Sequence, residues 1–262
     1  MSENKILPAP EEEGNMTLMG HLVELRERLL RAVLAIMLVF LGLLYFSNDI
    51  YSIVSKPIRD ALPEGTSMIA TEVTSPFFAP FKLTLVVAVL IAIPVILHQI
   101  WRFISPGLYT HEKKIAVPLL VSSIFLFYLG ISFAYFVVFP LVMGFFTSIG
   151  PEDIMITPDI NQYLNIALKL FFAFGFAFEI PIATLLLVWS GVVDVESLKE
   201  KRAYVVVSCF VVGMLLTPPD LISQTLLALP MWLLFEVGII MSVILRPKRN
   251  EEDPLPLDKV ES

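Results

Sequence analysis

The chain has 262 residues, of which 56% are hydrophobic and only 16% are charged, and its mean hydropathy is +0.79. A soluble domain typically carries about 25% charged residues, so this composition excludes a disordered chain and disfavours a soluble globular protein. The net charge of −7 comes from the ends, since the first 20 residues hold one lysine and four acids and residues 250–262 hold one lysine and five acids. The neutral middle offers no basic face for nucleic acid.

Charge-poor stretches divide the chain into six candidate membrane spans. A helix needs about 20 mostly apolar residues to cross about 30 Å of hydrocarbon. We therefore expect an all-α integral membrane protein with six transmembrane helices, of which the last two are short. Residues 1–20 and 246–262 are expected to be charged tails that flank a membrane domain of residues 21–245. The expected spans are 32–48, 77–97, 116–139, 163–189, 204–216 and 221–245.

Prolines predict the shape of several spans. Pro94, Pro181 and Pro230 lie inside spans, where a proline bends a helix. Residues 204–216 cover only about 20 Å at 1.5 Å per residue, and Pro218 then stops the helix, so the last two spans should form a hairpin. Bent helices of unequal length favour a concave arrangement.

The distribution of Lys and Arg predicts the orientation. Fourteen of them lie in the segment before the first span (residues 1–31), in the tail after the last span (246–262), and in the second and fourth connections between spans. The other three connections hold only Lys56 and Arg59. Because positive loops stay in the cytoplasm, we expect both termini to be cytoplasmic and the protein to cross the cytoplasmic (inner) membrane several times.

No sequence motif for nucleotide or metal chemistry is present. The sequence lacks a Gly-rich phosphate loop, an HExxH pattern and a paired CxxC, and it has no nucleophile near a plausible base. We therefore expect no enzymatic activity, no cofactor and no metal site. The energy for any transport by this protein must therefore come from a partner protein or from the transmembrane gradient.

Glu179 is an acid expected near the middle of the membrane, where an ionisable group is costly and usually faces water or a partner. Lys169 lies about 15 Å away along a helix and cannot pair with it. A packing role for Glu179 is an alternative, and Glu236 is expected to reach the membrane interface. Two rival functions use Glu179: a secondary small-molecule transporter with Lys169 as a second coupling group, and an intramembrane enzyme.

Two cytoplasmic segments combine acids with basic residues. In the first, HLVELRERL at 21–29, Glu24 and Glu27 each precede an arginine by four residues on a predicted amphipathic helix. In the second, residues 101–114, Glu112 lies beside two lysines. Composition alone assigns Glu24 and Glu27 to surface ion pairs worth a few tenths of a kcal/mol, and Glu112 to a positively charged cytoplasmic loop with one neutralising acid.

With these segments the sequence resembles the TatC family, the polytopic receptor subunit of the twin-arginine protein translocase. Five motifs occur in order among the six spans, and the resemblance covers roughly residues 17–245. The motifs are HLVELRERL (21–29), MIATEVTSPFF (68–78), FISPGLYTHEKK (103–114), FAYFVVFPL (133–141) and VVGMLLTPPDLISQTLLALPMWLLFE (211–236).

The resemblance implies a glove-like six-helix protein that binds the paired arginines of signal peptides on folded precursors. It further implies single-span partner subunits of the TatA and TatB type, a homo-oligomer within a larger complex, and transport driven by the proton-motive force. Glu24 and Glu112 match the two signal-binding acids, and a carboxylate suits a guanidinium because it accepts both N–H groups of the planar fork. Positions that line or support this site are matched by His21, Leu25, Arg26 and Phe103.

The resemblance also assigns roles inside the membrane. Glu179 matches a polar spot on the concave face. In the hairpin, Met214, Thr217 and Gln224 match contacts with partner subunits, and Asp220 is expected to cap the last helix. For Gln224, a hydrogen bond between two helices of this chain is the alternative. For Phe103, which the resemblance places at the signal site, the alternative is anchoring at the membrane interface.

Overall fold

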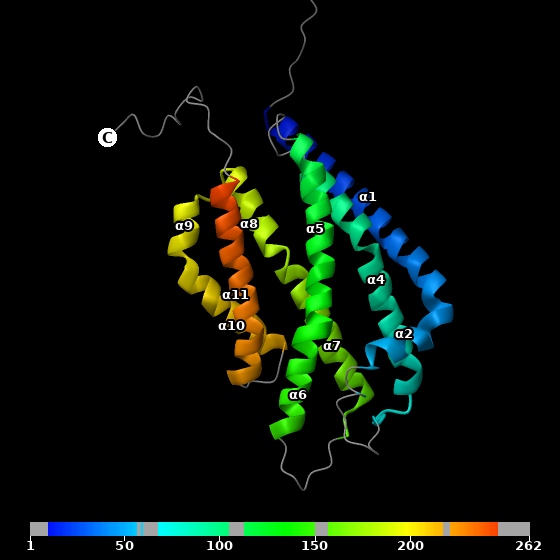
Figure 1. The fold of residues 1–262 in the computed structure, drawn as a ribbon. Coiled ribbons are helices and arrows are strands. Elements are labelled where there is room, and N and C mark those ends of the chain that lie inside the picture. The colour runs from blue at the N-terminus through cyan, green and yellow to red at the C-terminus, as the bar shows by residue number, and fades with distance from the viewer. Residues whose placement is uncertain are drawn as a thin grey trace, which may run out of the picture.

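The computed structural model describes residues 10–56, 59, 68–104, 113–149, 157–216 and 221–245, and nearly all of these residues are helical (Figure 1). The expected all-α fold is confirmed. The helices are α1 (Pro10–Leu43), η1 (Leu44–Phe46), α2 (Ser47–Val54), α4 (Ser75–Ile104), α5 (Lys113–Phe133), the π-helical η3 (Ala134–Val138), α6 (Phe139–Ile149), α7 (Ile160–Ala177), α8 (Ile180–Trp189), α9 (Val195–Glu200), α10 (Arg202–Leu216) and α11 (Leu221–Ile244).

Five helical stretches in the described part of the chain are long and apolar enough to cross a membrane. They are Leu22–Val54, Ser75–Phe103, Val117–Phe145, Ile160–Trp189 and Gln224–Ile244, and the last is the shortest at 21 residues. The remaining apolar segment is α10, whose 15 residues rise only about 22 Å. The six expected segments are therefore present, and the last two are the two shortest.

Of the three spans in which proline was expected to cause a bend, one is divided into two helices and two continue as single helices. Helix α4 runs through Pro94 and α11 runs through Pro230 without a break. The fourth span is divided, because α7 ends at Ala177 and α8 begins at Ile180 with Pro181 in its first turn. Proline lacks the backbone N–H that would continue the preceding helix, whereas it is well tolerated at a helix start.

The helices spread out from α5 and α7 at the centre rather than closing into a compact bundle (Figure 1). Helix α1 packs on α4 at one side, α9 to α11 form the other side, and α7 lies between them. The interior is built around α7, where Leu170 and Phe174 are fully buried. The beginning of α1 and the end of α11 lie at the same end of the molecule (Figure 1).

Candidate functional site

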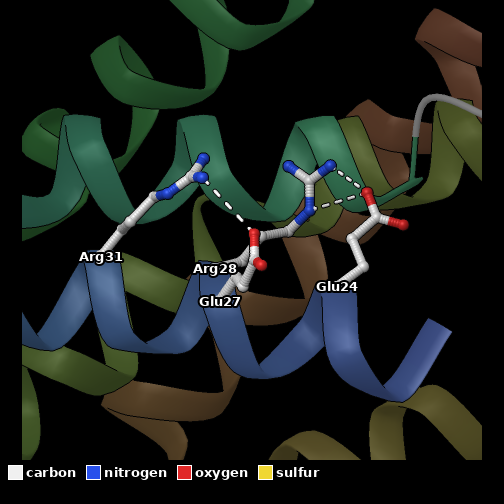
Figure 2. Close-up of polar contacts among 4 residues, drawn as sticks. All are labelled: Glu24, Glu27, Arg28 and Arg31. Carbon is white, nitrogen blue, oxygen red and sulfur yellow. Dashed lines mark hydrogen bonds and ion pairs between the residues drawn. The ribbon is translucent and has the colours of Figure 1, made fainter. Parts of the chain in front are cut away.

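Helix α1 presents Glu24 in contact with a guanidinium. The Nε atom of Arg28 donates a hydrogen bond of 3.0 Å to Oε1 of Glu24, and Nη2 of Arg28 donates to the same oxygen (Figure 2). The Glu24 side chain is 35% exposed, whereas that of Arg28 is only 12% exposed. The Glu24 carboxylate is therefore partly exposed and already bonded to a guanidinium of its own helix.

The neighbouring pair on the same helix is different in character. Arg31 and Glu27 approach within 3.5 Å, but their side chains are 57% and 62% exposed (Figure 2). Exposed pairs of this kind contribute about 0.2–1 kcal/mol at most and are screened by salt. Two pairs with the same spacing thus differ in burial, which makes the Glu27 pair a matched control for the Glu24 pair.

The packing of α1 on α4 brings other predicted residues to the same end of the molecule. Leu25 and Arg26 are exposed on α1, and Phe103 is half-buried in the last turn of α4. His21 lies within α1, but its side chain is outside the described residues, as is all of Glu112. The meeting of the two acids therefore remains a prediction.

Glu179 lies at the break between α7 and α8. Its Oε2 accepts a hydrogen bond from the hydroxyl of Ser123 on α5, a residue that is 1% exposed. Its other oxygen, Oε1, is buried and has no hydrogen-bond partner among the residues that the structure describes. Lys169 is exposed on α7. The carboxyl group is thus held by the third span, and one of its two oxygens remains unsatisfied.

In the hairpin formed by α10 and α11, Gln224 joins the two helices by a hydrogen bond. Its Nε2 donates a hydrogen bond of 2.8 Å to the carbonyl oxygen of Phe210. This is the helix-to-helix bond that the sequence left open as the alternative to a partner contact. Met214 is 48% exposed on α10, while Thr217 and Asp220 lie outside the described residues.

Glu236 pairs with an arginine of the preceding helix. Its Oε2 is 2.7 Å from Nη2 of Arg202, the first residue of α10. The Arg202 side chain is half-exposed, whereas the Glu236 side chain is 19% exposed. It ties the beginning of α10 to the middle of α11.

A polar clasp that the sequence analysis missed joins the first connection to the fourth span. Asp159 caps α7 by accepting hydrogen bonds from the backbone of Asn161 and Gln162. Its second oxygen accepts 3.0 Å and 2.7 Å bonds from the backbone N–H and the hydroxyl of Thr71. These bonds to Thr71, with the cap, lower the pKa of Asp159 from 3.8 to about 2. An aspartate directly before an apolar helix is a cap signal, whereas nothing local predicts the bond to Thr71.

Comparison with known proteins identifies the family. A family model described as Sec-independent protein translocase protein (TatC) matches residues 20–230. The TatC protein of Azotobacter chroococcum is 58% identical over 95% of this chain and 96% of its own length. The TatC protein of Escherichia coli K12 is 53% identical over 92% and 94%. The chain belongs to the TatC family.

A solved structure agrees with this assignment. A crystal structure of the twin arginine translocase receptor TatC is 41% identical, covers 86% of this chain and 98% of its own, and superposes with a TM-score of 0.77. This TatC protein is therefore a multi-pass membrane protein and a component of the Sec-independent translocase. In the described ranges, no group of three or more His, Cys, Asp or Glu side chains is arranged to hold a metal ion.

Proposed function

We propose that this TatC protein is the receptor and core component of a twin-arginine translocase. It binds the paired arginines of signal peptides on folded precursors, and with single-span subunits of the TatA and TatB type it supports their export. The proton-motive force supplies the energy. The description of its 41% identical structural relative as a twin arginine translocase receptor supports this role.

The contact between Glu24 and Arg28 is the observation that carries the proposal. It gives a partly exposed carboxylate that already binds a guanidinium through two N–H donors. The geometry favours arginine over lysine, because an ammonium group lacks the planar fork. Glu112 is the second acid of the proposed site, and Leu25, Arg26, Phe103 and His21 line or support it.

The proposed orientation places this site in the cytoplasm. The concentration of Lys and Arg in the tails and in alternate connections supports cytoplasmic termini. The common position of the beginning of α1 and the end of α11 also supports it (Figure 1). We propose that the protein lies in the cell inner membrane, with residues 1–20 and 246–262 as charged cytoplasmic tails.

The hairpin is the proposed docking region for the single-span subunits. The exposure of Met214 supports a contact there, and Thr217, three residues later in the sequence, is a second proposed contact. Gln224 contributes to this docking region indirectly, because its amide bonds to Phe210 and holds α11 against α10. We also propose that the protein works as a homo-oligomer within the larger complex.

The small-molecule transporter that the sequence left open gains no support. Its two coupling groups were Glu179 and Lys169. Glu179 is bonded to Ser123 on another helix, and Lys169 is exposed. The polar spot at Glu179 is instead proposed to serve the translocation step.

Export of a folded reporter with a twin-arginine signal tests the proposal. In cells that lack their own TatC, Glu24→Ala combined with Glu112→Ala should abolish export, because both guanidinium acceptors are removed. Glu27→Ala is the matched control, since its carboxylate belongs to the exposed pair, and export should persist. Undiminished export in the double variant would refute the site.

A further inference from the structure

Within the described part of the chain, two buried polar atoms on facing helices have no hydrogen-bond partner. They are Nη1 of Arg28 on α1 and Oε1 of Gln99 on α4. The first is a donor and the second an acceptor, so each offers what the other lacks. A buried polar atom without a partner is costly, and such atoms need an explanation.

The register of the two helices places these groups at a similar height. Helices α1 and α4 pack side by side and run in opposite directions (Figure 1), and the rings of Phe40 and Phe81, which meet edge to face at 5.1 Å, set their register. Gln99 lies 18 residues beyond Phe81, which is five full turns, and therefore on the same face of α4, about 27 Å along it. Glu24 lies 16 residues before Phe40, about 24 Å along α1.

The Arg28 side chain already reaches back to the level of Glu24. Its guanidinium bonds to the Glu24 carboxylate, one turn toward the beginning of α1 (Figure 2). Gln99 lies only about 3 Å farther along the axis by the same rise per residue. Ala88 and Ala92, on the same face of α4, are fully buried and allow the two helices to approach closely.

We propose that Arg28 is an internal occupant of the Glu24 carboxylate and that Gln99 receives it when a signal peptide binds. In the free protein the Arg28 guanidinium occupies Glu24, and two buried atoms remain unpaired. An incoming peptide arginine takes the carboxylate, and the Arg28 side chain moves to Oε1 of Gln99, which satisfies both atoms. This inference rests on the proposed receptor function and adds two positioning residues to it.

The exchange predicts opposite effects for two substitutions. Arg28→Gln removes the competitor and should tighten binding of an Arg-Arg peptide to the detergent-solubilised full chain by about fivefold, the scale of a partly exposed ion pair. Gln99→Leu removes the acceptor and should weaken binding by a similar factor. In the Arg28→Gln background, Gln99→Leu should have no effect, because no displaced arginine remains.

A second variant of Gln99 keeps the test informative if Gln99→Leu perturbs folding. Gln99→Glu supplies a charged acceptor that holds Arg28 away from Glu24, so peptide binding should become tighter than in the wild type. A purely structural role for Gln99 would instead weaken binding in both variants. Arg31→Gln, from the exposed pair, is the control and should leave the affinity unchanged.

Fluorescence anisotropy with a labelled Arg-Arg peptide distinguishes failure of the exchange from failure of the receptor site. If Glu24→Gln weakens binding but Arg28→Gln does not tighten it, the exchange is refuted and the receptor site stands. The exchange is also refuted if the effect of Gln99→Leu persists in the Arg28→Gln background. If Glu24→Gln leaves binding unchanged, the proposed function itself is refuted.

Discussion

Gly130 on α5 provides a sharp test of the packing that positions Glu179. A Cβ atom added there would contact the carbonyl oxygen of Phe174 and lie 2.9 Å from its carbonyl carbon and 3.0 Å from Cβ of Phe178. Two of these contacts are with the α7 backbone, which cannot rotate away. Gly130→Ala must therefore push α5 from α7, next to the bond between Ser123 and Glu179.

The expected loss of stability follows from two opposing terms. Overpacking costs about 1–3 kcal/mol, and the obstruction by backbone places this site at the upper end. Alanine returns about 1 kcal/mol of helix propensity. The net loss of about 2 kcal/mol corresponds to about 4–8 °C in Tm for a chain of this size.

Thermal unfolding in detergent, followed by circular dichroism, measures this loss. Gly42→Ala on α1 is the control, because no described residue lies within 4 Å of the added Cβ and only the propensity gain remains. We expect Gly42→Ala to unfold at or above the wild-type temperature. A Gly130→Ala protein as stable as Gly42→Ala would show that α5 and α7 do not pack as described.

Three further predictions concern polar groups. Asp159→Asn should lower Tm at neutral pH, because the ionised carboxylate stabilises the fold. The pKa of Asp159 falls from 3.8 to about 2 on folding, so the difference in Tm between wild type and variant should disappear as the pH drops through that range. A difference in Tm that stays constant with pH would refute the role of the charge. Ser123→Ala should impair export of a reporter more than peptide affinity, because it removes the partner of Glu179; a loss of affinity alone would contradict this. For Gln224→Leu, site-specific crosslinking to a partner subunit should weaken because the hairpin loosens; unchanged crosslinking would show that this bond does not shape the docking region.

The membrane layout could be predicted from the sequence because it depends on local composition. Charge-free runs mark the spans, and the shortness of α10 follows from its 15 residues. The prolines alone did not show which span would be divided. The helices at Pro94 and Pro230 continue because neighbouring helices and local adjustments can support the freed backbone groups, whereas the span at Pro181 divides.

The partners of the polar groups could not be predicted, because they join distant parts of the chain. Glu179 bonds to a serine 56 residues away, and Asp159 bonds to a threonine 88 residues away. Gln224 had two plausible partners, and only the packing of α10 on α11 shows which one the chain itself supplies. The pair of Glu24 and Arg28 was visible in the spacing, but the difference in burial from its neighbour was not.

The most direct test of the receptor role is the affinity of the solubilised protein for an Arg-Arg signal peptide compared with a Lys-Lys peptide. The measurement is made on the wild type and on the Glu24→Gln/Glu112→Gln variant. We predict a strong preference for Arg-Arg in the wild type and its loss in the double variant, because amides cannot replace charged acceptors for the guanidinium fork. Equal affinities for both peptides in the wild type, or a preference that survives the double substitution, would contradict the account.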